Sequence, residues 1–218
     1  MWEFNGVTGA GEAPPPIANG FSGLLTIMGG AECIWRDMQG VAALFGKHLK
    51  PLWADEDIPG DIMAVNDIGT YWQGKLHHWV TLHGMYMAGW RKFRMKHCFG
   101  KGAHVHTHSY REPRSMANPE GIDIIWDIAN VGGTSGLFAC RVAFALGYSK
   151  IILAGIPMDN SRHFFDAPWY GGVPLESHPE MLVWIQARDE CFNGRVRSMS
   201  GRTKMWLGEP TKEWLEAT

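Results

Sequence analysis

A run of glycines and hydroxyl residues offers the clearest binding chemistry in this sequence. Gly132-Gly133-Thr134-Ser135-Gly136 directly precedes a segment with helical spacing that runs to Leu146. A glycine turn that opens a helix presents unpaired backbone N–H groups beside the positive end of the helix dipole, which suits a phosphate. The same glycines would also allow a tight turn and close packing, and spacing alone does not separate the two interpretations. Neither GxGxxG nor GxxxxGK[ST] occurs, so the standard dinucleotide and P-loop fingerprints are absent.

Glycine and polar residues also follow other predicted strands. In open parallel sheets, ligands bind at the carboxyl ends of strands near a switch in strand order, where loops and helix N-termini converge. The positions directly after strands are therefore candidates for the same binding site. They are Gly29, Gly30, Asn66, Asp67, Gly155 and Asp159.

One histidine stands where a mobile loop could carry it to a ligand. His178 begins a predicted helix after a loop, residues 156–177, that is rich in Phe, Trp, Tyr and Gly and could form a lid. An unperturbed imidazole titrates near neutrality, so it suits a general base for a hydroxyl acceptor. The alternative is a histidine at a helix N-terminus with no chemistry.

Alternating histidines mark another predicted strand. His104, His106 and His108 would share one face of the strand 103–109, which is a conceivable metal face. A half-exposed strand face is the commoner origin of such a pattern, so we expect no metal site.

Short apolar segments alternate with helix-length segments after an N-terminal arm. Residues 1–22 are rich in Gly, Ala and Pro and form an arm or linker, and residues 23–218 form one domain. Short, almost wholly apolar strands are typical of a parallel sheet covered on both faces, so we predict a single Rossmann-like α/β domain with a mainly parallel sheet. The predicted strands are 24–28, 61–65, 78–82, 103–109, 122–125, 150–154 and 196–199. The predicted helices are 32–45, 85–96, one that the run ending at Gly136 opens and that continues to Leu146, one from about 179, and 211–217.

Composition narrows the class of protein. The chain has 218 residues, 45% hydrophobic and 19% charged, with a net charge of −2, which argues against disorder and against a strongly basic nucleic-acid-binding face. The four cysteines are far apart and form no CxxC pair, so we expect reduced thiols in a cytoplasmic protein. No apolar run reaches the roughly 20 residues of a membrane helix, so we expect no membrane span.

The stretch from Gly133 to Asn160 resembles the nucleotide-binding segment of the bacterial CMP-sialic-acid-dependent sialyltransferases. It is also similar to related uncharacterised or pterin-diphosphokinase-like proteins, and the chain resembles uncharacterised proteins carried by tailed phages. Weaker similarities follow in the same order along the chain, at the first glycine pair, at Asn66 and at His178. The shared central features are Thr134-Ser135-Gly136, the Ala-Leu-Gly-Tyr of residues 145–148, and a strand ending in Gly155-Ile156.

This resemblance implies a GT-A-variant fold and a glycosyltransferase-like, homo-oligomeric enzyme. It would transfer a sugar from a CMP-type nucleotide-activated donor to an unspecified hydroxyl acceptor, with inversion and without a metal or cofactor. In the family, the positions of Asn66 and of Ser135-Gly136 hold the nucleotide, and the position of His178 is the general base. The expected nucleotide-binding residues are Gly29, Gly30, Asn66, Gly133, Thr134, Ser135, Gly136, Gly155 and Asp159.

The chain departs from the family at two places. Glu32 follows the first glycine pair where the family has Asn and Ser nearby, and a carboxylate there would be a poor neighbour for a phosphate. Two family tyrosines that assist the leaving phosphate correspond to positions near Asp159 and His163. His163 could replace one of them as a cationic donor, so we expect His163 to act beside His178, whereas an ionised Asp159 could not donate.

Two other functions fit the same residues. A pterin or nucleotide pyrophosphokinase-like phosphotransferase would need Mg²⁺ held by carboxylates such as Asp67 or Asp159. A non-catalytic, phage-borne nucleotide-binding module would keep the fold and lose the chemistry. Dependence on Mg²⁺ separates the first of these from a metal-independent transferase.

Overall fold

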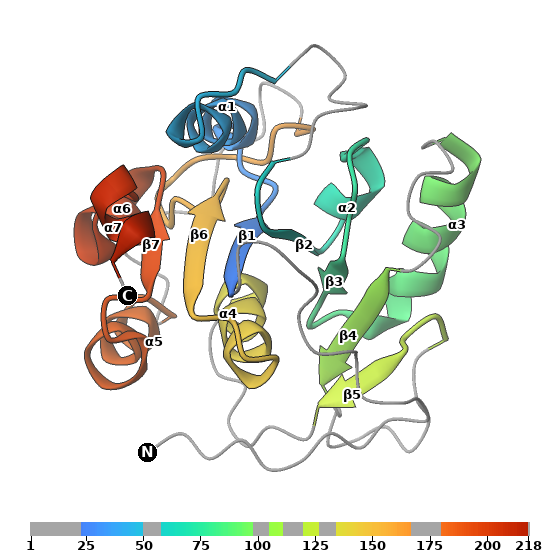
Figure 1. Cartoon of the computed structure of the whole chain (residues 1–218). Helices are drawn as coiled ribbons and strands as arrows, with labels where there is room; N and C mark the ends of the chain where they lie inside the picture. Colours follow the sequence, from blue (N-terminus) through green and yellow to red (C-terminus); the bar gives the residue numbers. More distant parts are fainter. Residues whose placement is uncertain are drawn as a thin grey trace.

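Seven parallel strands form one open sheet in the order β5-β4-β3-β2-β1-β6-β7 (Figure 1). The computed structural model describes residues 23–49, 58–97, 105–110, 120–126, 134–166 and 180–217. The predicted Rossmann-like α/β fold with a parallel sheet is confirmed. The strands are Leu24–Met28 (β1), Asp61–Val65 (β2), His78–Val80 (β3), His106–Tyr110 (β4), Ile124–Trp126 (β5), Lys150–Ala154 (β6) and Val196–Ser198 (β7).

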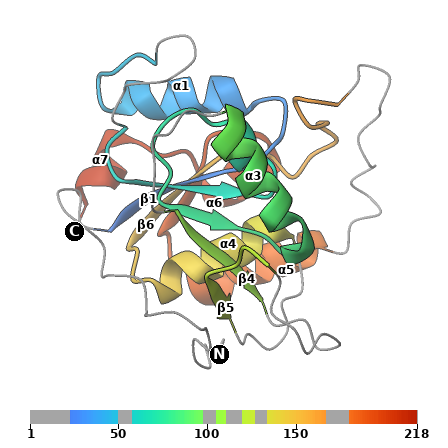
Figure 2. The ribbon, with the colours of Figure 1, turned by 90° about the vertical axis from the view of Figure 1, so that its right-hand side faces the viewer.

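Helices cover both faces of the sheet. Helix α1 lies on one side, and α4 and α5 lie on the other (Figure 2). The helical elements are Ile34–Leu44 (α1), Ile68–Tyr71 (α2), the 3-10 turn Gly84–Tyr86 (η1), Met87–His97 (α3), Ser135–Ala145 (α4), Glu180–Ala187 (α5), the π-turn Arg188–Phe192 (η3), Gly201–Leu207 (α6) and Lys212–Glu216 (α7).

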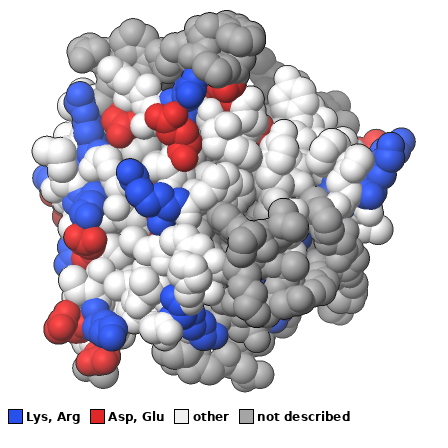
Figure 3. All heavy atoms as spheres, turned by 90° about the horizontal axis from the view of Figure 1, so that it is seen from above, with Lys and Arg blue, Asp and Glu red and all other residues white. Residues whose placement is uncertain are grey.

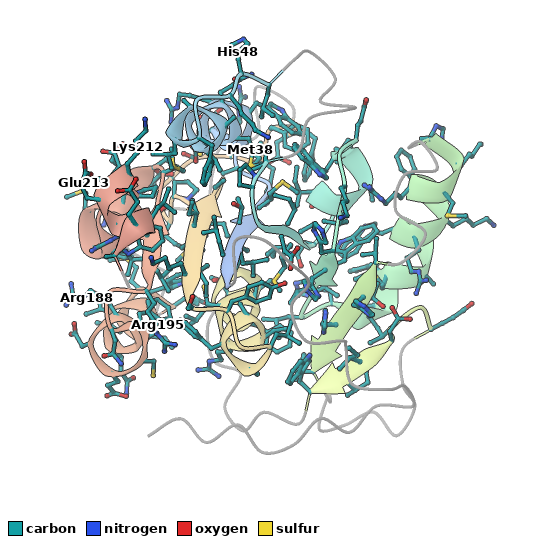
Figure 4. The ribbon with its side chains drawn as sticks, in the orientation of Figure 1. Met38, His48, Arg188, Arg195, Lys212 and Glu213 are labelled. Atoms are coloured by element: carbon teal, nitrogen blue, oxygen red, sulfur yellow. The ribbon has the colours of Figure 1, made fainter. Side chains whose placement is uncertain are left out.

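Alternation along each strand explains how the two apolar layers form. In β1, Leu25 and Ile27 join the core that includes α4, whereas Leu24 and Met28 join the core that includes α1. All five residues of β1 are buried, as expected for a central strand covered on both faces. Met38 of α1 is fully buried and lies on the sheet side of its helix, whereas His48 is exposed on the outside (Figure 4).

The order of the strands reverses beside β1. The chain builds β2 to β5 on one side of β1, then crosses through α4 to place β6 on its other side, with Met28 in register with Ala154. In an open α/β sheet, such a switch point opens a crevice outside the carboxyl ends of the two strands. The ends of β1 and β6 are therefore where a ligand site is expected.

Several element boundaries differ from the predictions. Strand β3 ends at Val80 rather than at residue 82. Two short helices, α2 with four residues and α6 with seven, were not predicted. Helix α6 follows the N-cap Ser200 and begins at Gly201, which has a φ of 63° and lies so close to Pro157 that a Cβ atom would not fit. The arm at 1–22 and the later part of the predicted lid, 167–177, lie outside the described residues.

Candidate functional site

Two of the predicted site glycines bring β1 and β6 into close contact. A Cβ atom on Gly29 would lie 2.5 Å from the carbonyl oxygen of Gly155, and Gly155 itself has a φ of 66°. The N–H of Gly29 donates to the carbonyl of Ala154 at 2.8 Å. Both glycines are thus required by backbone packing.

A buried carboxylate links the segments that follow β6 and β7 behind this contact. Asp37 of α1 is 3% exposed, and its Oδ2 accepts from the N–H of Gly155 at 2.9 Å and from the hydroxyl of Ser200 at 2.5 Å. Sequence reasoning missed Asp37, although its place on the apolar stripe of α1 is unusual for a charged residue. The carboxylate thus fixes the backbone of Gly155 and the side chain of Ser200, which form the floor of the site together with Gly29.

The thiol beside this carboxylate is not an activated nucleophile. Sγ of Cys33 lies 3.3 Å from the Ser200 hydroxyl, and burial raises the pKa of Cys33 to about 12. A reactive cysteine needs a lowered pKa. Thiol chemistry is therefore not what this site provides.

Residues 161–166 form a strap across the end of β1. The strap is the orange segment that runs from the end of β6 towards α2 (Figure 1). It runs antiparallel to the β1–α1 loop: Glu32 N–H donates to the carbonyl of Arg162 at 2.9 Å, and Phe164 N–H donates to the carbonyl of Gly30 at 3.0 Å. The structure thus brings together two predicted site residues, because a Cβ on Gly30 would lie 3.3 Å from Cδ2 of His163.

The imidazole of His163 is oriented but remains accessible. Its Nδ1 lies 3.3 Å from Oδ2 of Asp166, and 60% of its side chain is exposed. Its ring stacks on Phe165, with centroids 5.1 Å apart and planes 4° apart, and Phe165 stacks on Tyr71 of α2. Within the described part of the chain, no hydrogen bond engages Nε2 of His163, which leaves this nitrogen available to a ligand.

The carboxylate of Glu32 is partly neutralised. Oε2 of Glu32 lies 3.2 Å from Nε of Arg162 in the strap. We expected this carboxylate to repel a phosphate, but the guanidinium beside it offsets that repulsion. The strap therefore compensates for the departure from the family pattern in the first glycine loop.

Asn66 presents a side-chain donor at the end of β2. Its backbone is left-handed, with a φ of 57°, and its N–H donates to the carbonyl of Val80 at 3.0 Å. The hydroxyl of Thr81 donates to Oδ1 of Asn66 at 2.9 Å, which fixes the orientation of the amide. No acceptor among the described residues engages Nδ2, so this NH₂ group is free to donate to a ligand.

The N-terminus of α4 lies against the end of β6. Thr134 is the N-cap, and its hydroxyl accepts from the N–H of Leu137 at 3.3 Å and from Nε1 of Trp184 at 3.1 Å. A Cβ on Gly136 would lie 3.2 Å from Ile156, so the start of the helix faces the segment after β6. Ser135 is 7% exposed, and no partner among the described residues engages its hydroxyl. Thr134 is thus occupied by capping, whereas Ser135 keeps an unused hydroxyl.

Asp159, one of the carboxylates named for a metal site, takes part in a turn. Oδ1 of Asp159 accepts from the N–H of Ser161 at 2.9 Å and so forms the turn that starts the strap. In the segments that the structure describes, no group of three or more His, Cys, Asp or Glu residues could hold a metal ion.

The histidine face of β4 carries a hydrogen-bonded chain rather than a metal face. Nδ1 of His108 accepts from the indole N–H of Trp126 at 3.1 Å, and Nε2 of His108 lies 3.0 Å from Nδ1 of His78. The chain continues through the hydroxyl of Tyr148 to the carboxylate of Asp61. Both ring nitrogens of His108 are therefore occupied. His104 lies outside the described residues.

Two predicted site residues fall outside the described segments, namely Gly133 and His178. Among the described helices, none is both long and apolar enough to cross a membrane. On the face seen in Figure 3, basic and acidic side chains are interspersed with uncharged ones, and no basic patch dominates the described residues there.

Comparisons with known proteins agree with this architecture. No protein family model and no curated protein matches the sequence. The crystal structure of the monofunctional alpha-2,3-sialyltransferase Cst-I from Campylobacter jejuni is 12% identical, with a TM-score of 0.54, over 94% of this chain and 86% of that chain. The chain has a sialyltransferase-like fold. The sialyltransferase CST-II, solved with a trisaccharide acceptor and CMP, is 14% identical, with a TM-score of 0.52, over 87% of each chain. At these identities the likeness concerns the fold.

Proposed function

We propose that this chain is a glycosyltransferase-like enzyme that transfers a sugar from a CMP-type nucleotide-activated donor to a hydroxyl acceptor. The transfer inverts the anomeric carbon and needs no metal. One observation carries the proposal: the strap holds an oriented, accessible imidazole, His163, directly over Gly30 at the switch point of a sialyltransferase-like sheet. A cationic donor at this place suits a departing phosphate.

The proposed reaction is a single displacement. The acceptor oxygen forms a bond to the anomeric carbon while the bond from that carbon to the phosphate oxygen breaks. The electron pair of the broken bond stays on the phosphate of CMP, and the proton of the acceptor hydroxyl goes to His178, by resemblance the general base. Protonated His163, held by Asp166, donates a hydrogen bond to the phosphate oxygen on which charge accumulates.

Groups at the same edge that have no partner among the described residues would hold the nucleotide. The Ser135 hydroxyl at the start of α4, the helix N-terminus itself and the Asn66 amide are available donors. In this proposal Gly29 and Gly155 shape the backbone beneath the nucleotide, and Thr134 and Asp159 hold the loops that border it.

A ligand panel tests the donor assignment. We would measure melting temperatures with CMP, CDP, UDP, GDP and ATP, each with Mg²⁺ and with EDTA, for wild type, His163→Gln and His48→Gln. A ligand that binds only the folded state raises the melting temperature by mass action. CMP is expected to stabilise wild type and the exposed control His48→Gln equally in EDTA, and His163→Gln less. Stabilisation by ATP that requires Mg²⁺, with none by CMP, would instead favour a phosphotransferase.

A further inference from the structure

A cavity lies at the amino ends of the strands, at the opposite edge of the sheet from the candidate site. Its volume is about 1020 Å³, and its walls come from the starts of β1 and β6, the end of α1, the turn before β7, and α7. In Figure 2, α7 lies at one end of the sheet and the orange strap at the other. Ligand pockets in proteins commonly have volumes of about 300–1000 Å³. The cavity is therefore large enough for a small organic molecule, and it is separate from the proposed nucleotide site.

Apolar side chains form much of the wall of this cavity. Helix α7 has no buried residue, and its Trp214 and Leu215 stay partly exposed although they pack against the core beneath α1. Apolar surface that faces a hollow forfeits the dispersion contacts and the burial that a filling group would supply. A ligand with an apolar body would recover them. The apolar lining residues are Leu24, Leu44, Phe45, Trp214 and Leu215.

Hydrogen bonds at its edges hold α7 in place over the cavity. The indole N–H of Trp214 donates to the carbonyl of Gly194 at 2.9 Å. The ammonium of Lys150 donates to the carbonyl of Leu215 at 2.7 Å and to that of Ala217, and it lies 5.9 Å from the centroid of the Trp214 ring. These bonds fix the outer wall without filling the space behind it.

Three cations line the same cavity and have no ion-pair partner among the described residues. They are Lys150, Arg195 and Lys212, and the last two lie on the α7 side of the sheet (Figure 4). The exposed Glu216 is the one carboxylate of the lining, so positive charge prevails here although the whole chain has a net charge of −2. A cleft with charges of one sign attracts ligands of the opposite sign.

We propose that this cavity binds a small amphipathic anion, whose apolar body lies between Phe45 and Trp214 and whose anionic group lies beside Lys150, Arg195 and Lys212. The apolar walls and the unpaired cations match the two parts of such a molecule. This inference goes beyond the proposed function and does not depend on it, because it concerns the other edge of the sheet.

Fluorescence titration with anilinonaphthalene sulfonate and with its uncharged analogue N-phenylnaphthylamine tests the site. The two probes share their rings, and only the first carries an anionic group. Wild type is expected to bind the sulfonate about tenfold tighter or more than the uncharged probe, the usual effect of one hydrogen bond to a charged group.

Two variants and a control locate the bound probe. Ser149→Trp replaces an exposed lining residue by an indole that fills the cavity, and it is expected to abolish binding of the sulfonate. Lys212→Gln removes one exposed cation and should weaken binding about two- to fivefold. The matched control is Lys92→Gln, which removes an exposed cation from α3 and should bind as wild type does.

Equal affinity of wild type for the two probes would overturn the anion site, and so would the absence of binding. Wild-type affinity in Ser149→Trp, or displacement of the sulfonate by CMP, would overturn it as well, because the probe would then lie elsewhere. Melting temperatures of the variants show whether a loss of binding reflects unfolding. If Ser149→Trp does not fold, the comparison of Lys212→Gln with Lys92→Gln decides, and equal affinities of these two variants would overturn the proposal.

Discussion

Acid should destabilise this protein through two buried histidines that the fold holds in their neutral form. The indole N–H of Trp126 can only donate, so Nδ1 of His108 accepts and its Nε2 carries the proton. That proton is donated to Nδ1 of His78, whose Nε2–H is donated in turn to Tyr148. The Tyr148 hydroxyl then donates to Oδ2 of Asp61 at 2.5 Å. A second proton on either imidazole would set two donors against each other and break the chain.

The size of the effect follows from the pKa values. Burial lowers the pKa of His78 from 6.5 to about 3, and burial also lowers that of His108 well below 6.5. Between pH 6.5 and about pH 3, these histidines bind protons in the unfolded chain but not in the folded chain. The free energy of unfolding therefore has its full value above pH 6.5 and falls as the pH drops towards 3. Each histidine contributes about 1.4 kcal/mol per pH unit, so the two together cost about 4 kcal/mol at pH 5.

Urea unfolding followed by circular dichroism at pH 7.5, 6 and 5 measures this loss. Wild type and the exposed control His48→Gln should lose the same free energy of unfolding between pH 7.5 and 5. The variant His78→Gln should be less stable at pH 7.5 but lose about half as much on acidification. A wild-type free energy of unfolding that changes by less than about 1 kcal/mol between pH 7.5 and 5 would refute the buried neutral chain.

Further predictions concern the floor of the site and the chain itself. Gly29→Ala should lower the free energy of unfolding by several kcal/mol, because its Cβ would lie 2.5 Å from the Gly155 carbonyl oxygen. The control Gly89→Ala on α3, with open space around it, should raise the free energy of unfolding by about 0.5–1 kcal/mol. Equal melting temperatures of the two variants would contradict this. Asp37→Ala should cost about 2–4 kcal/mol by leaving the Gly155 N–H and the Ser200 hydroxyl unpaired, measured by urea unfolding, and a cost below 1 kcal/mol would show that the two donors find other partners. Tyr148→Phe should cost about 1–3 kcal/mol at pH 7.5, since it leaves both His78 and Asp61 without their common partner, and a neutral effect would remove the hydroxyl from the chain.

The sheet could be predicted from sequence where local signals are strong. β1, β2 and β6 were predicted at their exact bounds, because each is a short apolar run that ends at a glycine or an asparagine. Helix α6 was missed, although Ser200 is its N-cap, because it spans only seven residues, Gly201 to Leu207, and buries only Thr203 and Leu207. Local pattern therefore predicts elements whose burial and ends depend on nearby residues.

The site could be predicted only in part, because its contacts join distant residues. Resemblance to a family placed His163 near the leaving phosphate, but its antiparallel pairing with Ala31 is invisible in local spacing. Likewise, Asp37 meets Gly155 from 118 residues away, and Glu32 finds Arg162 from 130 residues away. Such pairings are decided by the topology of the sheet rather than by the sequence near each residue.

We propose that this edge of the sheet catalyses transfer from a CMP-activated sugar, with His163 as the hydrogen-bond donor to the leaving phosphate. The most direct measurement is release of CMP from CMP-N-acetylneuraminic acid in EDTA, with a trisaccharide acceptor, for wild type, His163→Gln and His48→Gln. We predict release by wild type and by His48→Gln at equal rates, and a kcat about 10²–10³-fold lower for His163→Gln, the usual effect of removing one donor that stabilises developing charge. No release by wild type, or equal kcat values for wild type and His163→Gln, would contradict the account.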